Sequence, residues 1–191
     1  MSLPENIRLF VAARIPDDRL AAVDVVMSPL RDKLTNARWT TPENQHLTIK
    51  FLGSSPVDRL DAITKTCAMV ASGHEPARMV MTSLGAFPSK TRVRVLWIGV
   101  EDPAGLLTGL AADLDRAFEP LGFSAEGRPY TPHLTVARFK LAVPLRSGFP
   151  DVDTSDIEPF DVADVVLFRS HLSPKGARYE VMSTFPLGSR A

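Results

Sequence analysis

The apolar residues of this chain follow two spacings, and each spacing predicts a different kind of element. Residues 9–13 are apolar throughout, which predicts a buried strand. From about Asp17 the spacing changes to three and four residues, which predicts a helix whose apolar face consists of Leu20, Val23, Met27, Leu30 and Leu34. Pro29 lies inside this pattern, so the helix is expected either to kink there or to restart with Ser28 as its cap.

Two further helices alternate with strands in the rest of the sequence. Ser55-Pro56 is expected to cap the second helix, and Asp102-Pro103 the third, which ends at Gly122. Their apolar faces are Leu60, Ile63, Cys67 and Val70, and Leu107, Leu110, Leu114 and Phe118. We expect strands at residues 45–52, stopping at Gly53, and at 78–84, 92–100, 133–140, 162–168 and 178–185. Segments rich in polar residues, Pro or Gly predict loops at 87–90, 143–159 and 172–176.

One four-residue motif occurs twice, each time within a predicted strand: His46-Leu47-Thr48-Ile49 and His133-Leu134-Thr135-Val136. Residues i and i+2 of a strand point to the same face, so each motif presents an imidazole and a hydroxyl together. A single such motif is common in strands, but the chain has only 4 His, and half of them occupy this position. Both motifs also follow a proline-containing, non-helical approach. Chance duplication is therefore the weaker explanation.

Each motif strand belongs to a similar unit of strands and a helix. This repetition predicts an α+β fold with two pseudo-symmetric lobes of antiparallel-rich sheet, flanked by helices, around a central cleft. The chain length fits a single two-lobed domain spanning residues 1–191. The two motifs are expected to meet at the cleft.

Composition limits the classes of protein to which this chain can belong. A hydrophobic content of 45% and a charged content of 23% are ordinary for a globular protein. The formal net charge is +0, so any RNA contact must come from a local cluster of cations. The single Cys67 excludes an intramolecular disulfide and a cysteine-based zinc cage, and its helical spacing predicts a buried structural residue. The sequence shows neither a secretory signal pattern nor a long apolar run, which predicts a cytoplasmic protein without membrane contact.

Two imidazoles facing one cleft suit acid–base chemistry on a phosphate ester. In-line displacement at phosphorus needs one group that takes the proton of the nucleophile and one that protonates the leaving oxygen. The unperturbed pKa of histidine, about 6.5, suits both tasks near neutral pH. A metal site would instead need further His or carboxylate ligands, whereas Thr occupies the i+2 position of both motifs. We therefore expect neither a metal nor another cofactor.

The paired motifs resemble those of the 2H phosphoesterase family. The wider sequence is similar to its branch of RNA 2′,3′-cyclic phosphodiesterases, also called 2′-5′ RNA ligase-like proteins, at residues 8–12, 38–53, 95–100, 128–138 and 185–187. This resemblance implies a two-lobed α+β fold with a central cleft. It also implies metal-free opening of a 2′,3′-cyclic phosphate at RNA or nucleotide ends to a 2′-phosphate. Some members join RNA ends through a 2′-5′ link, which is the reverse reaction.

The resemblance also implies roles for individual residues. His46 would donate a proton to the leaving 3′-oxygen, and His133 would activate water. Thr48 and Thr135 would hold the phosphate, and Arg138 would be a further phosphate contact. Strict alternation, however, places Arg138 on the face opposite His133, so either a bulge or twist turns it inward or its role is only structural.

Several other residues have a less specific pattern. Lys50 shares the face of His46 under strict alternation, which predicts a substrate contact, and Tyr130 is a candidate for stacking on a base. Phe51 is a second aromatic candidate, although packing in the core or cleft wall is favoured for it. Lys90, Arg92 and Arg94 form a small basic cluster that suits either an RNA backbone or a solvated strand edge.

The other two histidines are expected to be structural: His74 as a solvated residue after a helix, and His171 at a strand end. The main alternative to an enzyme is an RNA- or nucleotide-binding module with little turnover. The paired histidines and threonines favour the enzyme, because binding alone needs no matched acid and base. The expected partners are RNA ends or nucleotides that carry a 2′,3′-cyclic phosphate. The sequence indicates no obligate protein partner.

Overall fold

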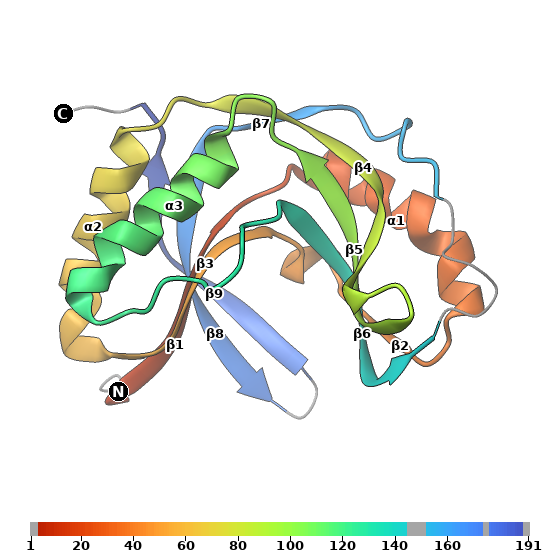
Figure 1. The fold of residues 1–191 in the computed structure, drawn as a ribbon, viewed down its shortest axis with the longest axis horizontal. Coiled ribbons are helices and arrows are strands. Elements are labelled where there is room, and N and C mark those ends of the chain that lie inside the picture. The colour runs from red at the N-terminus through yellow and green to blue at the C-terminus, as the bar shows by residue number, and fades with distance from the viewer. Residues whose placement is uncertain (1–3, 145–151, 174–175, 189–191) are drawn as a thin grey trace.

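Two antiparallel sheets form the framework of the computed structural model, which describes residues 4–144, 152–173 and 176–188 (Figure 1). The four-stranded sheet has the order β3-β1-β8-β9, and the five-stranded sheet has the order β2-β6-β5-β4-β7. The strands are β1 Asn6–Ala13, β2 Ala37–Trp39, β3 Leu47–Pro56, β4 Ala77–Ser89, β5 Arg92–Glu101, β6 His133–Val143, β7 Phe160–Val162, β8 Asp164–Ser173 and β9 Gly176–Pro186. The two sheets therefore place the motif strands β3 and β6 in different lobes.

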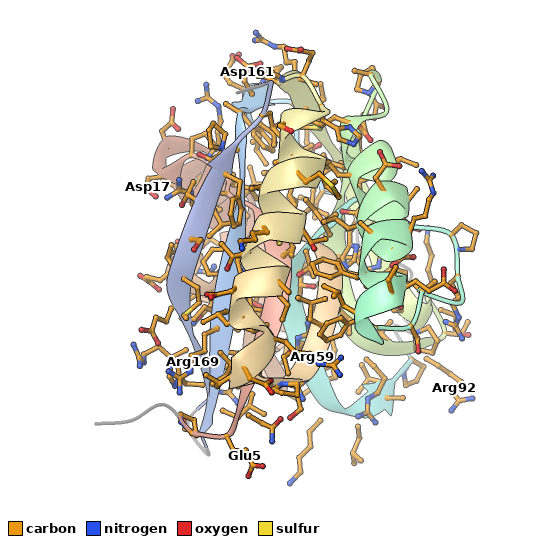
Figure 2. The ribbon with its side chains drawn as sticks, turned by 90° about the vertical axis from the view of Figure 1, so that its left-hand side faces the viewer. Glu5, Asp17, Arg59, Arg92, Asp161 and Arg169 are labelled. Carbon is orange, nitrogen blue, oxygen red and sulfur yellow. The ribbon has the colours of Figure 1, made fainter. Side chains whose placement is uncertain are left out.

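Three α-helices flank the sheets: α1 Asp17–Lys33, α2 Leu60–Ser72 and α3 Leu106–Phe118. In Figure 1, α1 lies beside the five-stranded sheet, whereas α2 and α3 lie beside the four-stranded sheet. Figure 2 shows α2 and α3 side by side on that side of the molecule. The predicted α+β fold with two antiparallel lobes and flanking helices is thus confirmed. That residues 1–191 form a single domain remains a prediction.

The helical patterns of the sequence are largely confirmed, but Ser28, Ser55 and Asp102 do not occupy the cap positions expected for them. In α1, the buried residues are Leu20, Val23, Met27 and Leu30. The helix runs through Pro29 without interruption, so the alternative of a restart at Ser28 is wrong. Ser55 does not cap α2, because it belongs to β3, where its hydroxyl donates to the Gly53 carbonyl. A short 3₁₀ turn, Val57–Arg59, separates β3 from the helix.

The third helix begins at Leu106, later than the Asp102-Pro103 pair predicts. The Asp102 carboxylate still acts at this end of the helix, because it accepts hydrogen bonds from the backbone N–H and the hydroxyl of Thr108 at 2.9 and 3.1 Å. Asp102 therefore accepts a hydrogen bond from a backbone N–H at the start of this helix, as a cap would, but it does not occupy the N-cap position, which is Gly105. Carboxylates near a helix N-terminus satisfy free N–H groups in this way.

Several strand limits also differ from the predictions. The strand β3 continues through Gly53, which adopts a left-handed φ of 67° beside a change in its register with β1. Glycine tolerates this conformation, so the strand bends there and does not stop. The strand β4 extends to Ser89, and the predicted loop at 87–90 is reduced to a turn. Of the predicted loop at 143–159, residues 152–159 are irregular as expected and Val143 belongs to β6, whereas 145–151 lie outside the described residues. The predicted loop at 172–176 is wrong where it is described, because β8 extends to Ser173 and β9 begins at Gly176; residues 174–175 lie outside the described residues.

The aliphatic residues of the two motifs anchor both motif strands in the core. Leu47 and Leu134 are fully buried, and Ile49 and Val136 are nearly so. The free energy of burying these side chains fixes which face of each strand meets the core, and so which face the His and Thr residues occupy. Cys67 is likewise buried, as predicted, and burial raises the pKa of its thiol to about 12. Among the described residues, no helix is long and apolar enough to span a bilayer.

Candidate active site

A single cleft of about 800 Å³ brings the two motifs together. His46 and Thr48 line it from the four-stranded sheet, and His133 and Thr135 line it from the five-stranded sheet. Residues of β8 and β9 and residues of the paired strands β2 and β6 also line this cleft, and Figure 1 shows where these elements lie. All four motif side chains therefore lie in one cleft, as the repeated motif predicts.

A β-bulge follows the first motif threonine. Thr48 pairs with Ala12 of β1 and Lys50 pairs with the adjacent Val11, so Ile49 has no partner of its own. The extra residue shifts the alternation of side chains by one position. Ile49 and Lys50 both point into the core, and the next residue that lines the cleft is Phe51.

The second motif strand has a bulge at the equivalent position. Thr135 pairs with Trp97 of β5 and Ala137 pairs with the adjacent Leu96, which leaves Val136 without a partner. The shift brings Arg138 onto the cleft face, where it lies among the lining residues. The bulge that the sequence required for an inward-facing Arg138 is thus present. Phe51 and Arg138 occupy equivalent places, each five residues after a motif histidine.

The prediction that Lys50 contacts substrate is wrong, because the bulge at Ile49 turns its side chain away from the cleft. Lys50 is 1% exposed, and its ammonium lies 2.5 Å from a carboxylate oxygen of Asp115 in α3. It also donates to the carbonyl of Ser124 at 2.6 Å. Ser124 belongs to the segment that leads to the second motif. Lys50 therefore ties the first motif strand to α3 and to this approach segment.

Tyr130 also has a supporting position and does not line the cleft. Its hydroxyl donates to the carbonyl of Thr48 at 3.0 Å, and burial raises the pKa of that hydroxyl. The predicted contact of Tyr130 with a base is therefore wrong, since the ring packs against the core. The bond connects the approach of the second motif to the backbone of the first. Lys50 and Tyr130 thus connect the two halves of the site through contacts outside the cleft.

His46 lies among aromatic rings. Its imidazole centroid is 4.8 Å from that of Phe10, 5.0 Å from that of Tyr179 and 5.8 Å from that of Phe168. Burial lowers the pKa of His46 to about 4, against a hydrogen bond with the Asn44 carbonyl that raises it. The positive charge of Arg138 lowers this pKa further. In the free protein at neutral pH, His46 is therefore uncharged.

His133 has a defined tautomer. Its Nδ1 lies 2.7 Å from the Thr131 carbonyl, which can only accept, so Nδ1 carries the proton. The other nitrogen, Nε2, is then an acceptor. Phe87 contacts the ring edge to face at 5.0 Å, and burial lowers the pKa of His133. In both motifs, therefore, the carbonyl two residues before the histidine holds the imidazole.

Cations dominate the charged lining of the cleft. Four arginines line it, Arg8, Arg38, Arg138 and Arg178, whereas no Asp or Glu does so among the residues that the structure describes. This local positive field is present although the formal net charge is +0. Clefts with one sign of charge concentrate ligands of the opposite sign. The chemistry of the lining thus suits an anion.

Sequence reasoning missed several residues of this site. Phe168 and Tyr179 come from the last two strands, and only the sheet order β3-β1-β8-β9 brings them to His46. Phe51 was expected to pack either in the core or in the cleft wall. It is 55% exposed and lines the cleft, so the second alternative is correct. Arg8 and Arg38 fall within the segments that carried the family resemblance, which was the available signal.

The remaining candidates lie outside the cleft. His74 is not solvated as expected, because its side chain is 16% exposed and contacts Asp113 of α3 at 3.0 Å. His171 is structural as expected, since it contacts Glu180 on the neighbouring strand at 2.7 Å. The basic cluster of Lys90, Arg92 and Arg94 lies at the β4–β5 turn and is not part of the lining. Among the described residues, no three His, Cys, Asp or Glu side chains are grouped as metal ligands.

Known proteins resemble this chain over nearly its whole length. The family model for the 2′-5′ RNA ligase superfamily matches residues 16–174. An RNA 2′,3′-cyclic phosphodiesterase of Methanothermobacter thermautotrophicus is 31% identical, with 95% of this chain and 100% of the relative covered. A protein of the same name from Archaeoglobus fulgidus is 31% identical, with 93% and 99% covered.

Solved structures share the fold. TT0787 of Thermus thermophilus matches with a TM-score of 0.82 and 27% identity, and the match covers 97% of this chain and 100% of that one. Escherichia coli LigT in its apo form matches with a TM-score of 0.78 and the same coverage. Its identity of 22% supports a likeness of fold alone.

Proposed function

Because this chain belongs to the 2′-5′ RNA ligase superfamily, we propose that it hydrolyses 2′,3′-cyclic phosphate ends of RNA or nucleotides to 2′-phosphomonoesters. The curated relatives named RNA 2′,3′-cyclic phosphodiesterase support this class of reaction. The observation that carries the proposal for this chain is the pair of His-x-Thr motifs, which line one arginine-rich cleft from two sheets.

In this mechanism His133 is the base. Its Nε2 takes a proton from water, and the resulting hydroxide attacks phosphorus in line with the 3′-oxygen. The bond from phosphorus to the 3′-oxygen breaks, and His46 donates its proton to that oxygen. The product carries a free 3′-hydroxyl and a 2′-phosphate. The tautomer of His133 supports its role, because a proton on Nδ1 leaves Nε2 free to accept another, and the residue lines the cleft.

His46 must carry a proton when the substrate is bound, although its pKa of about 4 leaves it neutral in the free protein. The bound phosphate would raise the pKa of His46 toward neutral pH. A negative charge near an imidazole favours the protonated form and so raises the pKa. The same anion offsets the charge of Arg138, which lowers the pKa of His46 in the free protein. Substrate binding would therefore prepare the acid for its step.

Charge that develops on the non-bridging oxygens would be stabilised by Thr48, Thr135 and Arg138. The two hydroxyls approach from opposite sheets, and the guanidinium follows on the same face as Thr135. The exposed ring of Phe51 offers a surface for the nucleobase. The proposal needs no metal, since these groups cover the acid, the base and the charge stabilisation.

The direct test incubates the purified protein with a nucleoside 2′,3′-cyclic phosphate in EDTA and identifies the product isomer. We expect the 2′-phosphate. We expect His46→Ala and His133→Ala each to lower kcat by about a hundredfold or more, the usual scale of one general acid or base. His74→Ala, outside the cleft, is the matched control. Normal turnover by a folded double variant would refute the mechanism, and a requirement for a divalent ion would refute its metal-free form. Binding without turnover would favour a binding module.

A further inference from the structure

Trp97 lies in β5, the middle strand of the five-stranded sheet, between a motif residue and a glycine. It pairs with Thr135 of β6 on one side and with Gly85 of β4 on the other. Side chains of directly paired residues in antiparallel strands share one face, so the indole lies on the face of the motif threonine. A Cβ placed on Gly85 would meet three carbons of the indole ring at 2.0, 2.1 and 2.4 Å. Glycine at 85 therefore leaves the space that the indole occupies.

The indole belongs to a cluster of three rings that includes the proposed base. Its centroid lies 5.9 Å from that of the His133 imidazole and 5.2 Å from that of the Phe87 ring. Phe87 in turn meets His133 edge to face at 5.0 Å. Trp97 and Phe87 are not among the residues that line the cleft, so their contacts with His133 do not depend on a ligand.

The hydrogen bond of His133 does not by itself fix the imidazole. The terminal torsion of a histidine side chain is broad and roughly two-fold, so the ring rotates unless its neighbours prevent it. The Thr131 carbonyl holds only Nδ1. Rotation would displace Nε2, the nitrogen that takes a proton from water in the proposed mechanism. Rings packed against the imidazole restrict this rotation by steric contact.

We propose that Trp97 is a positioning residue for His133, and that Gly85 serves the reaction by admitting the indole. The inference rests on the proposed function, in which His133 activates water. A general base must lie within hydrogen-bond reach of the proton that it takes, and a displacement of about 1 Å can lower a rate by roughly a hundredfold. Two residues outside the cleft would therefore act on the rate through the orientation of one imidazole.

Gly85→Ala tests the inference without altering any side chain that contacts His133. The φ of Gly85 is not left-handed, so the backbone accepts alanine, but the new methyl group must displace the indole. We expect kcat to fall by roughly tenfold or more, and KM to change by less than about twofold because the phosphate contacts remain. Gly73→Ala is the matched control, since a Cβ there meets only the Val70 carbonyl at an ordinary 3.4 Å. It should behave as the wild type.

A double-mutant cycle separates the indole from other effects of the added methyl group. Trp97→Ala should lower kcat about as much as Gly85→Ala does, and Trp97→Phe, which keeps a ring, should lower it less. In the Trp97→Ala background, Gly85→Ala should cause less than about a twofold further loss, because no indole remains to be displaced. Equal losses in both backgrounds would overturn the role given to Gly85.

Nitrogen NMR of the free protein reads the state of His133 without turnover. In the wild type, His133 should show a single tautomer with its proton on Nδ1. In Gly85→Ala it should exchange between two tautomers. Its pKa, which burial lowers in the wild type, should then rise toward the ordinary value of histidine as water reaches the ring. His46, in the other sheet, should keep its tautomer and its pKa.

The outcomes separate this inference from the proposed function. Two tautomers of His133 in the wild type would overturn it, as would unchanged His133 signals in a Gly85→Ala variant that has lost activity. Equal changes at His46 would also overturn it, because the substitution would then have loosened the whole site. If the wild type hydrolyses no cyclic phosphate, the proposed function fails and the NMR comparison alone decides the positioning role. If Gly85→Ala does not fold, Trp97→Phe supplies the same NMR comparison.

Discussion

The aromatic surroundings of His46 predict a stability that depends on pH. Its pKa falls from 6.5 to about 4 in the folded protein, so between these values the unfolded chain binds a proton that the folded protein does not. Stability from this group is therefore fully present above about pH 6.5 and is lost as the pH falls toward 4. At about 1.4 kcal/mol per pKa unit, the full loss is about 3 kcal/mol. That is a large part of the roughly 5–15 kcal/mol typical of a domain.

The assay is urea unfolding between pH 7.5 and 4.5 in a buffer without phosphate, because a bound anion would itself stabilise the folded state. Carboxylates also titrate in this range, so the informative quantity is a difference between variants. We expect the wild type to lose about 2–3 kcal/mol more than His46→Asn, which cannot titrate. His74→Asn, outside the cleft, should follow the wild type. If the wild-type and His46→Asn curves run parallel, His46 is not held neutral by its surroundings and the reasoning fails.

Three further predictions concern the two motif histidines and the residues Lys50 and Tyr130 that support the motif strands. The pKa values of both motif histidines are lowered in the free protein, so the pH profile of kcat/KM should be bell-shaped with its maximum below about pH 6.5. The profile of kcat should peak at higher pH, because the bound phosphate raises these pKa values; coincident profiles would contradict this. Lys50→Met should lower the free energy of unfolding by about 3 kcal/mol, because it leaves Asp115 without its buried partner. The control is Lys65→Met at an exposed position, which should change the free energy of unfolding by less than about 0.5 kcal/mol. Tyr130→Phe should lower the free energy of unfolding, measured in urea, by about 1 kcal/mol. It should also lower kcat more than it raises KM, because the lost hydrogen bond positions the backbone of Thr48; an unchanged kcat would exclude a positioning role.

The sequence predicted the elements that depend on local spacing. The apolar face of α1 and the inward leucines of both motifs follow from periodicity alone, as does the common face of each His–Thr pair. The bulges at Ile49 and Val136 do not, because a bulge is defined by the pairing with a neighbouring strand. Strict alternation therefore assigned Lys50 to the cleft and Arg138 to the opposite face, and the structure reverses both.

The surroundings of His46 were unpredictable for a related reason. Phe10 reads as one more residue of a buried strand, and nothing near it in the sequence indicates a partner. The rings of Phe168 and Tyr179 reach it from strands near the other end of the chain. Contacts of such long sequence separation are set by sheet order, which single-sequence patterns do not contain.

The matching bulges have a consequence for the direction of the reaction. The two motif strands hold their imidazoles in nearly the same backbone setting, each with a carbonyl two residues earlier and an extra residue after the threonine. A site with such internal symmetry has no intrinsic polarity, and a ligand could enter it in two orientations of equal energy. The symmetry is broken five residues after each histidine, where one strand carries Phe51 and the other Arg138. In the proposed mechanism, the choice of which imidazole meets the leaving oxygen would therefore depend on such differences between the two halves, including a ring and a guanidinium that take no part in proton transfer.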